Sequence, residues 1–302
     1  MTGSASRDRP RVGVAISKAV LVVAALLVTV TACGSAKDLA EPAPPGPPTS
    51  PSSTAPPSAA SPTPTPGPAV TAPDAGDCRS LEPRDLVTRV TTTAAGPVTC
   101  AAKHNSQTYA VRSLKGGLRE AVTQGSEDRV FQAARGFCDR RLRRWLGAGA
   151  STVERSQFAF VVGVPSGADV AAGADWVRCD VYLRNGLSKA LELPRSTKGA
   201  LNGPKSDDYH SCVRGKIAAA SGTVPCYKRH RWRSVSSVEL GGPAKNYPGT
   251  GKVRGIVEQE CGRDVRDYLD TRDSFRYGYI LPTRATWKRG ERYGVCFART
   301  RK

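Results

Sequence analysis

The sequence lacks the motifs that mark the common hydrolases and phosphate-binding enzymes. It contains no Gly-x-Ser-x-Gly, Ser-x-x-Lys or His-Glu-x-x-His pattern and no phosphate-cradling glycine loop. Its 302 residues include only three histidines, and no acid–base pair stands out among them. We therefore expect no catalytic residue, no cofactor and no metal site, and we interpret the chain as a binding protein.

The apolar segment near the N-terminus is too short for a permanent membrane span. Residues 19–30 form an apolar stretch of 12 residues, whereas a spanning helix needs about 20. Basic residues precede it, as in a secretory signal, and Val30-Thr31-Ala32-Cys33-Gly34 resembles a bacterial lipobox. The resemblance implies cleavage before Cys33 and a lipid on that cysteine. It would anchor the protein to the cell membrane on the extracytoplasmic face. An ordinary cleaved signal or an uncleaved anchor is the alternative.

Charged and aromatic residues are nearly absent from the segment that follows. Residues 42–74 contain almost only Pro, Ala, Ser, Thr and Gly. Such a segment has little to bury and favours extended polyproline conformations. We predict that residues 33–75 form a lipid-anchored, disordered stalk.

Eight cysteines remain once the lipid-bearing one is set aside. An even number in an exported protein favours disulfides over free thiols or metal ligands. Each half of the chain has four cysteines, which permit three pairings. The strand and helix order inferred below favours Cys78–Cys100, Cys138–Cys179, Cys212–Cys226 and Cys261–Cys296.

The chain from about residue 76 onward has the pattern of an internal duplication. Residues 165–179 and 282–296 align without a gap, and each half has one Cys-x-x-x-His element. Around Cys138 and Cys261 apolar residues recur at steps of three and four, which predicts one helix in each half. Runs rich in β-branched and aromatic residues predict strands at 108–114, 157–164, 176–183, 235–240, 275–281 and 292–298.

These elements predict an α+β fold with two tandem small domains. Each is expected to be an antiparallel sheet with one packed helix and two disulfides. The expected boundaries are 1–32 for the signal peptide, 33–75 for the stalk, 76–186 for the first domain, 187–208 for a linker and 209–302 for the second domain.

The two halves resemble the bacterial septum-formation family, in two tandem copies. The matching features are Gly76-Asp77-Cys78, the two Cys-x-x-x-His elements, the helix cysteines and Pro282-x-x-x-x-Trp287-x-x-Gly290-x-Arg292-x-x-x-Cys296. The family usually has Glu three residues after the histidine, where this chain has Gln107 and Arg233. The resemblance implies small extracytoplasmic domains and a link to cell division, but no reaction and no ligand.

His104 and His230 are candidate partner-binding residues. Zinc is one interpretation, because two cysteines and two histidines commonly bind it. The other is a histidine that packs beside a disulfide and hydrogen-bonds a turn, since the cysteines of each half can pair with one another. His210, in the hydrophilic connector, is expected to be a solvated loop residue.

The aromatic and glycine positions of the closing motif have structural interpretations. Trp176 and Trp287 are expected to cover the core rather than to recognise a ligand. Gly173 and Gly290 are expected to serve a turn that needs a permissive backbone.

Positive charge is abundant in both halves. Residues 76–200 contain 19 basic and 12 acidic side chains, and residues 201–302 contain 21 and 10. The densest basic spots are residues 140–145, 228–233 and 299–302, and the candidate partner-binding residues in them are Arg143, Arg144, Arg231, Trp232 and Arg233. Such clusters can bind nucleic acid, but an exported protein meets none. We expect an anionic envelope polymer, an anionic lipid or an envelope protein as partner. A solvated surface that only keeps the protein soluble is the alternative.

Together these features predict a non-catalytic binding or scaffolding module of the cell envelope, linked to septum formation. An envelope hydrolase or sensor with a pocket near His104 or His230 is the alternative. A third interpretation is that the domains only pair with a division or secretion protein and that their charge is irrelevant.

Overall fold

The computed structural model describes residues 71–92, 96–186, 188–217, 222–241 and 246–300. The signal segment, the lipid-bearing cysteine and most of the stalk that the sequence predicts lie outside these residues. Within the described ranges, no helix is both long and apolar enough to cross a membrane.

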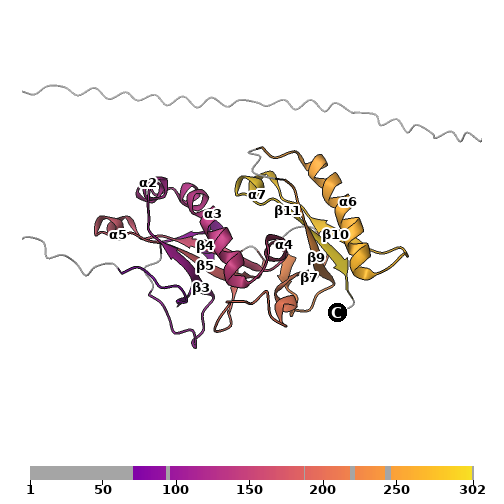
Figure 1. Cartoon of the computed structure of the whole chain (residues 1–302), viewed down its shortest axis with the longest axis horizontal. Coiled ribbons are helices and arrows are strands. Elements are labelled where there is room, and N and C mark those ends of the chain that lie inside the picture. Colours follow the sequence, from indigo (N-terminus) through magenta and orange to yellow (C-terminus); the bar gives the residue numbers. More distant parts are fainter. Residues whose placement is uncertain (1–70, 93–95, 187, 218–221, 242–245, 301–302) are drawn as a thin grey trace, which may run out of the picture. The chain divides into compact units, whose positions relative to one another are not determined.

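The first half of the described chain forms a six-stranded sheet with helices packed around it (Figure 1). Its elements are β1 (Cys78–Arg79), α1 (Pro83–Thr88), β2 (Val90–Thr91), β3 (Ser106–Arg112), α2 (Gly117–Thr123), α3 (Glu127–Leu146), α4 (Ala150–Glu154), β4 (Phe158–Gly163), α5 (Gly167–Ala171), β5 (Val177–Arg184) and β6 (Ala190–Leu191). The strands lie in the order β1-β3-β5-β4-β2, and β6 also pairs with β5. All pairs are antiparallel except β2 with β4.

The second half forms a separate five-stranded antiparallel sheet. Its elements are the 3-10 helix η1 (Ser206–Tyr209), β7 (Ser211–Val213), β8 (Thr223–Pro225), β9 (Trp232–Glu239), α6 (Thr250–Leu269), β10 (Tyr277–Ile280), α7 (Arg284–Lys288) and β11 (Tyr293–Arg299). The strands lie in the order β10-β11-β9-β7-β8. The α+β class with two sheets is therefore as the sequence predicts.

The two halves repeat one arrangement of elements. The path β1-β3-β5-β4 in the first sheet matches β7-β9-β11-β10 in the second. Each predicted strand and helix is present within a few residues of its expected bounds. The pieces that the sequence pattern missed, such as α1, α2, α4 and β6, have seven residues or fewer. Segments this short span too few residues to display a period.

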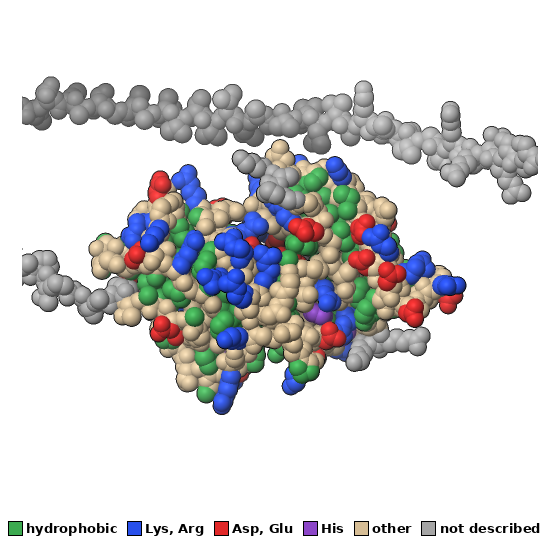
Figure 2. All heavy atoms as spheres, viewed as in Figure 1, with side chains coloured by type: hydrophobic (Ala, Val, Ile, Leu, Met, Phe, Trp, Pro, Cys, Tyr) green, Lys and Arg blue, Asp and Glu red, His purple; other side chains and the backbone are tan. Residues whose placement is uncertain are grey.

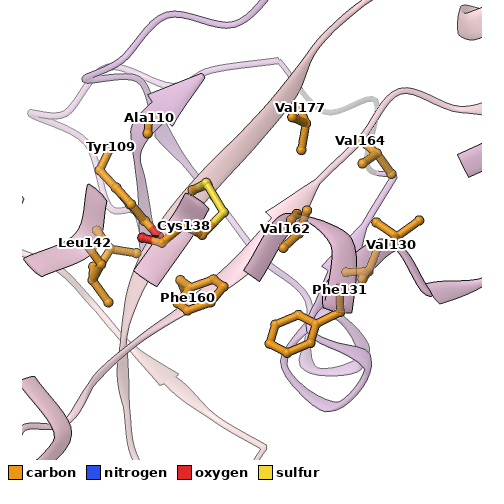
Figure 3. Close-up of a cluster of buried hydrophobic side chains, with 14 of the residues drawn as sticks. Tyr109, Ala110, Val130, Phe131, Cys138, Leu142, Phe160, Val162, Val164 and Val177 are labelled. Atoms are coloured by element: carbon orange, nitrogen blue, oxygen red, sulfur yellow. Dashed lines mark hydrogen bonds between the residues drawn. A yellow bond between two sulfur atoms is a disulfide. The ribbon is translucent and has the colours of Figure 1, made fainter. Parts of the chain in front are cut away.

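The core of the first half lies between α3 and the sheet. Val130, Ala134, Cys138 and Leu142 form the buried stripe of α3, and Figure 3 shows the cysteine's disulfide among the surrounding buried side chains. The helix ends at Gly147, whose φ of 74° is the left-handed conformation expected at a helix C-terminus. Burial of this apolar stripe, rather than intrinsic propensity, holds such a helix in place.

The core of the second half is smaller and relies more on partly buried aromatic side chains. The helix α6 buries Val253, Val257, Cys261 and Val265 against the sheet. Half-buried aromatic rings, including that of Phe275, complete this core. This half therefore buries less apolar surface, and its disulfides matter correspondingly more.

All four disulfides join the cysteines that the topology favoured. They are Cys78–Cys100, Cys138–Cys179, Cys212–Cys226 and Cys261–Cys296. In each half one bond pins the long helix to an inner strand of the sheet, β5 or β11, and the other ties the first strand to the segment that follows it. Loops of this size contribute about 3–4 kcal/mol each in the chain-entropy description.

The face of the first sheet opposite α3 is closed by the chain segment around α1. Leu81 and Leu86 pack there on Val161 and Tyr182, which point away from α3 because successive strand residues alternate between faces. A buried ion pair lies on the same face: Arg178 Nε is 2.8 Å from Asp180 Oδ2. Thr108 Oγ1 donates a further hydrogen bond of 2.7 Å to Asp180 Oδ1.

The segment expected as a linker packs on the first sheet. Leu193 and Leu201 belong to the first hydrophobic core. Gln107 Oε1 accepts hydrogen bonds from the backbone N and the Oγ1 of Thr197, at 2.9 and 2.8 Å. The amide nitrogen of Gln107 donates to the carbonyl of Gly76 at 3.3 Å. A glutamate carboxylate has no N–H to donate to this carbonyl, which gives a physical reason for Gln at this position.

His210 is buried at the junction of the two halves, so the expectation of a solvated loop residue was wrong. It forms an antiparallel bridge with Ser156, and its side chain is 4% exposed. Its Nδ1 lies 3.5 Å from the guanidinium of Arg155 and 3.4 Å from a carboxylate oxygen of Asp207. Burial and Arg155 outweigh the carboxylate and lower the pKa of His210 to about 4. The neighbours of His210 in the sequence are hydrophilic, so the local sequence does not indicate that strand pairing buries this histidine.

Candidate anion-binding groove

An open groove of about 1260 Å³ lies at one end of the second sheet. Five arginines form much of its wall: Arg214, Arg229, Arg231, Arg276 and Arg299. His230, Leu269, Phe275 and Thr300 also line it, and no acidic side chain of the described residues does. The wall therefore carries positive charge without a compensating carboxylate.

Four neighbouring strands each supply one arginine to this groove. Arg276 directly precedes β10, Arg299 ends β11, Arg231 directly precedes β9 and Arg214 directly follows β7. These strands are adjacent in that order. Because neighbouring strands lie about 4.8 Å apart, the row extends roughly 14 Å across the end of the sheet. We call these four residues the arginine row.

The backbone of the arginine row is fixed by hydrogen bonds between the strands. Thr300 N donates to the carbonyl of Arg231 at 2.9 Å, and Arg231 N donates to the carbonyl of Val213 at 2.9 Å. On the other side, Tyr277 is in register with Ala298, so Arg276 and Arg299 stand opposite each other at the next position. The starting points of the side chains are thus set before any ligand arrives.

The arginines of the groove are not neutralised within the described part of the chain. None of the five forms an ion pair with a described residue, and all five are exposed. Arg233, just beyond the groove, differs from them because its guanidinium lies 2.8 Å from Asp207 Oδ2. Exposed guanidiniums on a fixed frame are suited to phosphate or carboxylate groups, which they bind through two parallel hydrogen bonds.

The two candidate histidines have the same turn geometry. His104 Nδ1 donates to the carbonyl of Ala102 at 2.9 Å, and His230 Nδ1 donates to the carbonyl of Lys228 at 2.8 Å. Both side chains are buried. This is the turn-bonded histidine that the sequence favoured over a zinc ligand, and the cysteines of both halves are held in disulfides. In the described ranges, no cluster of three His, Cys, Asp or Glu side chains is placed to hold a metal.

The other predicted binding residues do not gather in one place. Arg231 belongs to the arginine row, but Arg233 is ion-paired and Trp232 Nε1 donates to the carbonyl of Gly215 at 3.0 Å. Arg143 and Arg144 lie in the last turn of α3, and Figure 2 shows Lys and Arg side chains clustered over that helix. The basic residues that the sequence grouped together therefore form at least two separate surfaces.

Sequence reasoning missed two members of the arginine row. Arg214 and Arg276 are isolated arginines, not parts of a basic cluster. What brings them together is the pairing of strands that are distant in sequence. The one feature of the sequence that could have identified them is that each arginine directly borders a strand, at what proves to be the same end of the sheet.

A second hollow of about 440 Å³ adjoins the groove. Phe275 lines both of them. Arg263 and Arg266 line the second hollow, and the guanidinium of Arg266 lies 4.7 Å from the centre of the Phe275 ring. Arg263 is ion-paired with Glu260. Positive charge therefore continues beyond the arginine row on the far side of Phe275.

The aromatic and glycine residues of the closing motif have the structural roles that the sequence predicts. Trp287 is 1% exposed and Trp176 is 7% exposed, so both belong to the interior. Gly173 and Gly290 have φ values of 98° and 87°, which side chains with a Cβ rarely adopt.

Comparisons with known proteins give one match. The family model described as Septum formation matches residues 75–296, in a single stretch that runs across both sheets. No curated protein and no solved structure matches the chain. The single match does not divide the chain into two copies of the family domain. It covers well over half of the chain, and the chain therefore belongs to the septum formation family.

Proposed function

We propose that this protein is an exported, lipid-anchored and non-catalytic module of the cell envelope, which takes part in septum formation by binding an anionic partner. The observation that carries this proposal is the arginine row, whose members have no acidic partner among the described residues. A solvated surface would be expected to mix both signs of charge. Here five cations face one hollow, and no carboxylate from the described ranges lines it.

Location outside the membrane is supported by the sequence and by the cysteines. The apolar stretch followed by Val30-Thr31-Ala32-Cys33 fits a lipoprotein signal. Four disulfides are typical of proteins in oxidising compartments and rare in the cytosol. Polyanions of the envelope, and not nucleic acid, would then be the partners within reach.

An envelope hydrolase or sensor is the second candidate, and the position of His230 in the groove wall favours it. A histidine acting as a general base needs a nucleophile within hydrogen-bond reach and is usually oriented by a carboxylate. Among the described residues, one hydroxyl lines the groove, that of Thr300, whose Oγ1 is buried and has no described partner. The same lining suits anion binding better than catalysis.

The test is binding of the full chain, held in neutral phosphatidylcholine nanodiscs, to purified cell-wall material. We expect co-sedimentation that weakens as salt is raised, because exposed charges are screened. The triple variant R231E/R276E/R299E should lose most of this binding.

A matched control places the same change of charge on α3. The variant R140E/R141E/R144E alters three exposed arginines outside the groove and should retain most of the binding. Equal loss in both triple variants would show that net charge, and not the groove, determines binding. Absence of salt-sensitive binding in the unaltered protein would refute the proposal.

A further inference from the structure

We propose that the ligand of this groove is a linear polyanion that lies lengthwise across the end of the second sheet and continues past Phe275 into the second hollow. This inference rests on the anion-binding function proposed above and names the class of anion. It distinguishes a chain of repeated charges from a single anionic group and from a membrane surface.

The length of the arginine row favours a chain over a single anion. One guanidinium can bind one phosphate or carboxylate through two parallel hydrogen bonds. The four backbone positions of the row span about 14 Å, because each comes from the next strand of the sheet. A chain with repeated charges can engage all four guanidiniums at this spacing, whereas a single anionic group can engage them only if the four side chains converge on it.

The second hollow extends this path. Phe275 is shared by both hollows, and Arg266 stands over its ring on the far side. Phe275 thus offers an apolar surface between two groups of guanidiniums. That alternation suits a polymer whose uncharged linkers separate its charged groups.

The concave shape of the site argues against a bilayer as the ligand. The groove is hollowed out at the end of the sheet, and part of its wall is formed by the buried side chain of His230. A flat surface would touch the rim, whereas a single extended chain can enter. The exposed arginines on α3 form a separate surface outside the groove.

The experiment measures affinity as a function of chain length. The probes are inorganic triphosphate, long-chain linear polyphosphate and phosphatidylglycerol vesicles, each offered to the full chain in neutral nanodiscs. Each arginine that contacts an anionic surface contributes about fivefold in affinity. The long chain is expected to contact two arginines that triphosphate does not reach. It should therefore bind about 25-fold more tightly than triphosphate at equal phosphate concentration.

A pair of variants tests the path past Phe275. Arg266→Ala should lower the ratio of long-chain to triphosphate affinity about fivefold, by removing one contact. Arg254→Ala removes an exposed arginine of the same helix that lines neither hollow, and it should leave that ratio unchanged. An equal loss for both probes in Arg266→Ala would contradict the proposed path.

The outcomes separate this inference from the proposed function. Equal affinity per phosphate for the short and the long chain overturns the polymer inference. Binding to vesicles without binding to polyphosphate also overturns it, although the anion-binding function would survive. Failure of every anionic probe to bind in a salt-sensitive way overturns both.

Discussion

Arg135 of α3 donates a hydrogen bond of 2.9 Å to the carbonyl of Gly290, in the turn that follows α7 of the other half. A neighbouring side chain of the same helix, Gln132, donates to the carbonyl of Lys288 at 3.0 Å. The closing motif of the second half therefore contacts the long helix of the first. Gly290 of this motif therefore has two roles: its carbonyl accepts the hydrogen bond from Arg135, and its positive φ forms the turn.

Replacing Gly290 with alanine should cost more stability than the same change at Gly173. Both glycines have left-handed φ values, which cost a residue with a Cβ about 1–2 kcal/mol. A Cβ at position 290 would also displace the guanidinium of Arg135 and break its hydrogen bond to the Gly290 carbonyl, whereas the space around Gly173 is open. Urea unfolding of G290A and G173A, with the disulfides intact, measures the difference.

The double variant R135A/G290A checks the cause. Measured against R135A alone, which lacks the Arg135 contacts already, the G290A change should cost only the part that comes from φ and should therefore match the cost of G173A. Equal losses in G290A and G173A would show that the packing against Arg135 contributes nothing.

Removing the carboxylate of Asp180 should destabilise the protein strongly. The change Asp180→Ala leaves Arg178, which is 2% exposed, without its ion-pair partner. Breaking a buried ion pair in this way typically costs about 3–5 kcal/mol. Asp175→Ala is the matched control, because the ion pair of Asp175 with Arg119 is 2.6 Å long but exposed. Exposed pairs contribute at most about 1 kcal/mol. Similar urea midpoints for the two variants would contradict this account.

Protonation of His210 should weaken the fold between about pH 6.5 and pH 4. The pKa of His210 is lowered from 6.5 to about 4 in the folded protein, chiefly by burial. Between these values the unfolded chain binds a proton that the folded chain does not, so stability falls as the pH falls. The loss should approach about 3 kcal/mol near pH 4. It should be absent above the unfolded value of pH 6.5, where the histidine is neutral in both states.

The variant His210→Gln isolates this contribution. Because Gln does not titrate, the difference in unfolding free energy between the two proteins should vary with pH only in that window. A difference that stays constant from pH 7 to 4.5 would contradict the lowered pKa.

Replacing Cys33 with serine should release the chain from lipid attachment. In the export pathway that the sequence predicts, Cys33 receives the lipid, and a bound acyl chain contributes about 0.8 kcal/mol for each buried methylene. Metabolic labelling with a radioactive fatty acid and intact mass measurement check this. Cys78→Ser, which removes a disulfide cysteine instead, should leave the label in place. Incorporation of the fatty-acid label into the Cys33→Ser variant would contradict the lipoprotein assignment.

The helices and strands with strong patterns could be predicted from the sequence, and so could the disulfides. α3 and α6 place apolar residues at helical steps, and the central strands carry β-branched and aromatic runs. The inferred order of strands and helix favoured one of the three pairings in each half, and the structure has that pairing. Local patterns were sufficient here because burial imposes them on consecutive residues.

The groove and the junction could not be predicted, because both depend on residues distant in sequence. Arg214 and Arg276 are 62 positions apart and line one groove only because β7, β9, β11 and β10 are neighbours. Likewise, Arg233 looked like a binding residue until the structure placed Asp207 beside it. The position of His210 depends on pairing with Ser156 in the other half. The composition shows that the chain is strongly basic, but it does not show which basic side chains lie together in the folded protein.

The most direct test of the central claim is to map which arginines a bound anionic ligand protects from chemical modification. The full chain would be treated with phenylglyoxal, with and without polyphosphate or cell-wall material, and each arginine read by peptide mass spectrometry. We predict protection at Arg231, Arg276 and Arg299, while Arg140, Arg141 and Arg144 on α3 continue to react. Protection of the α3 arginines alone, with the groove arginines still reactive, would contradict the account.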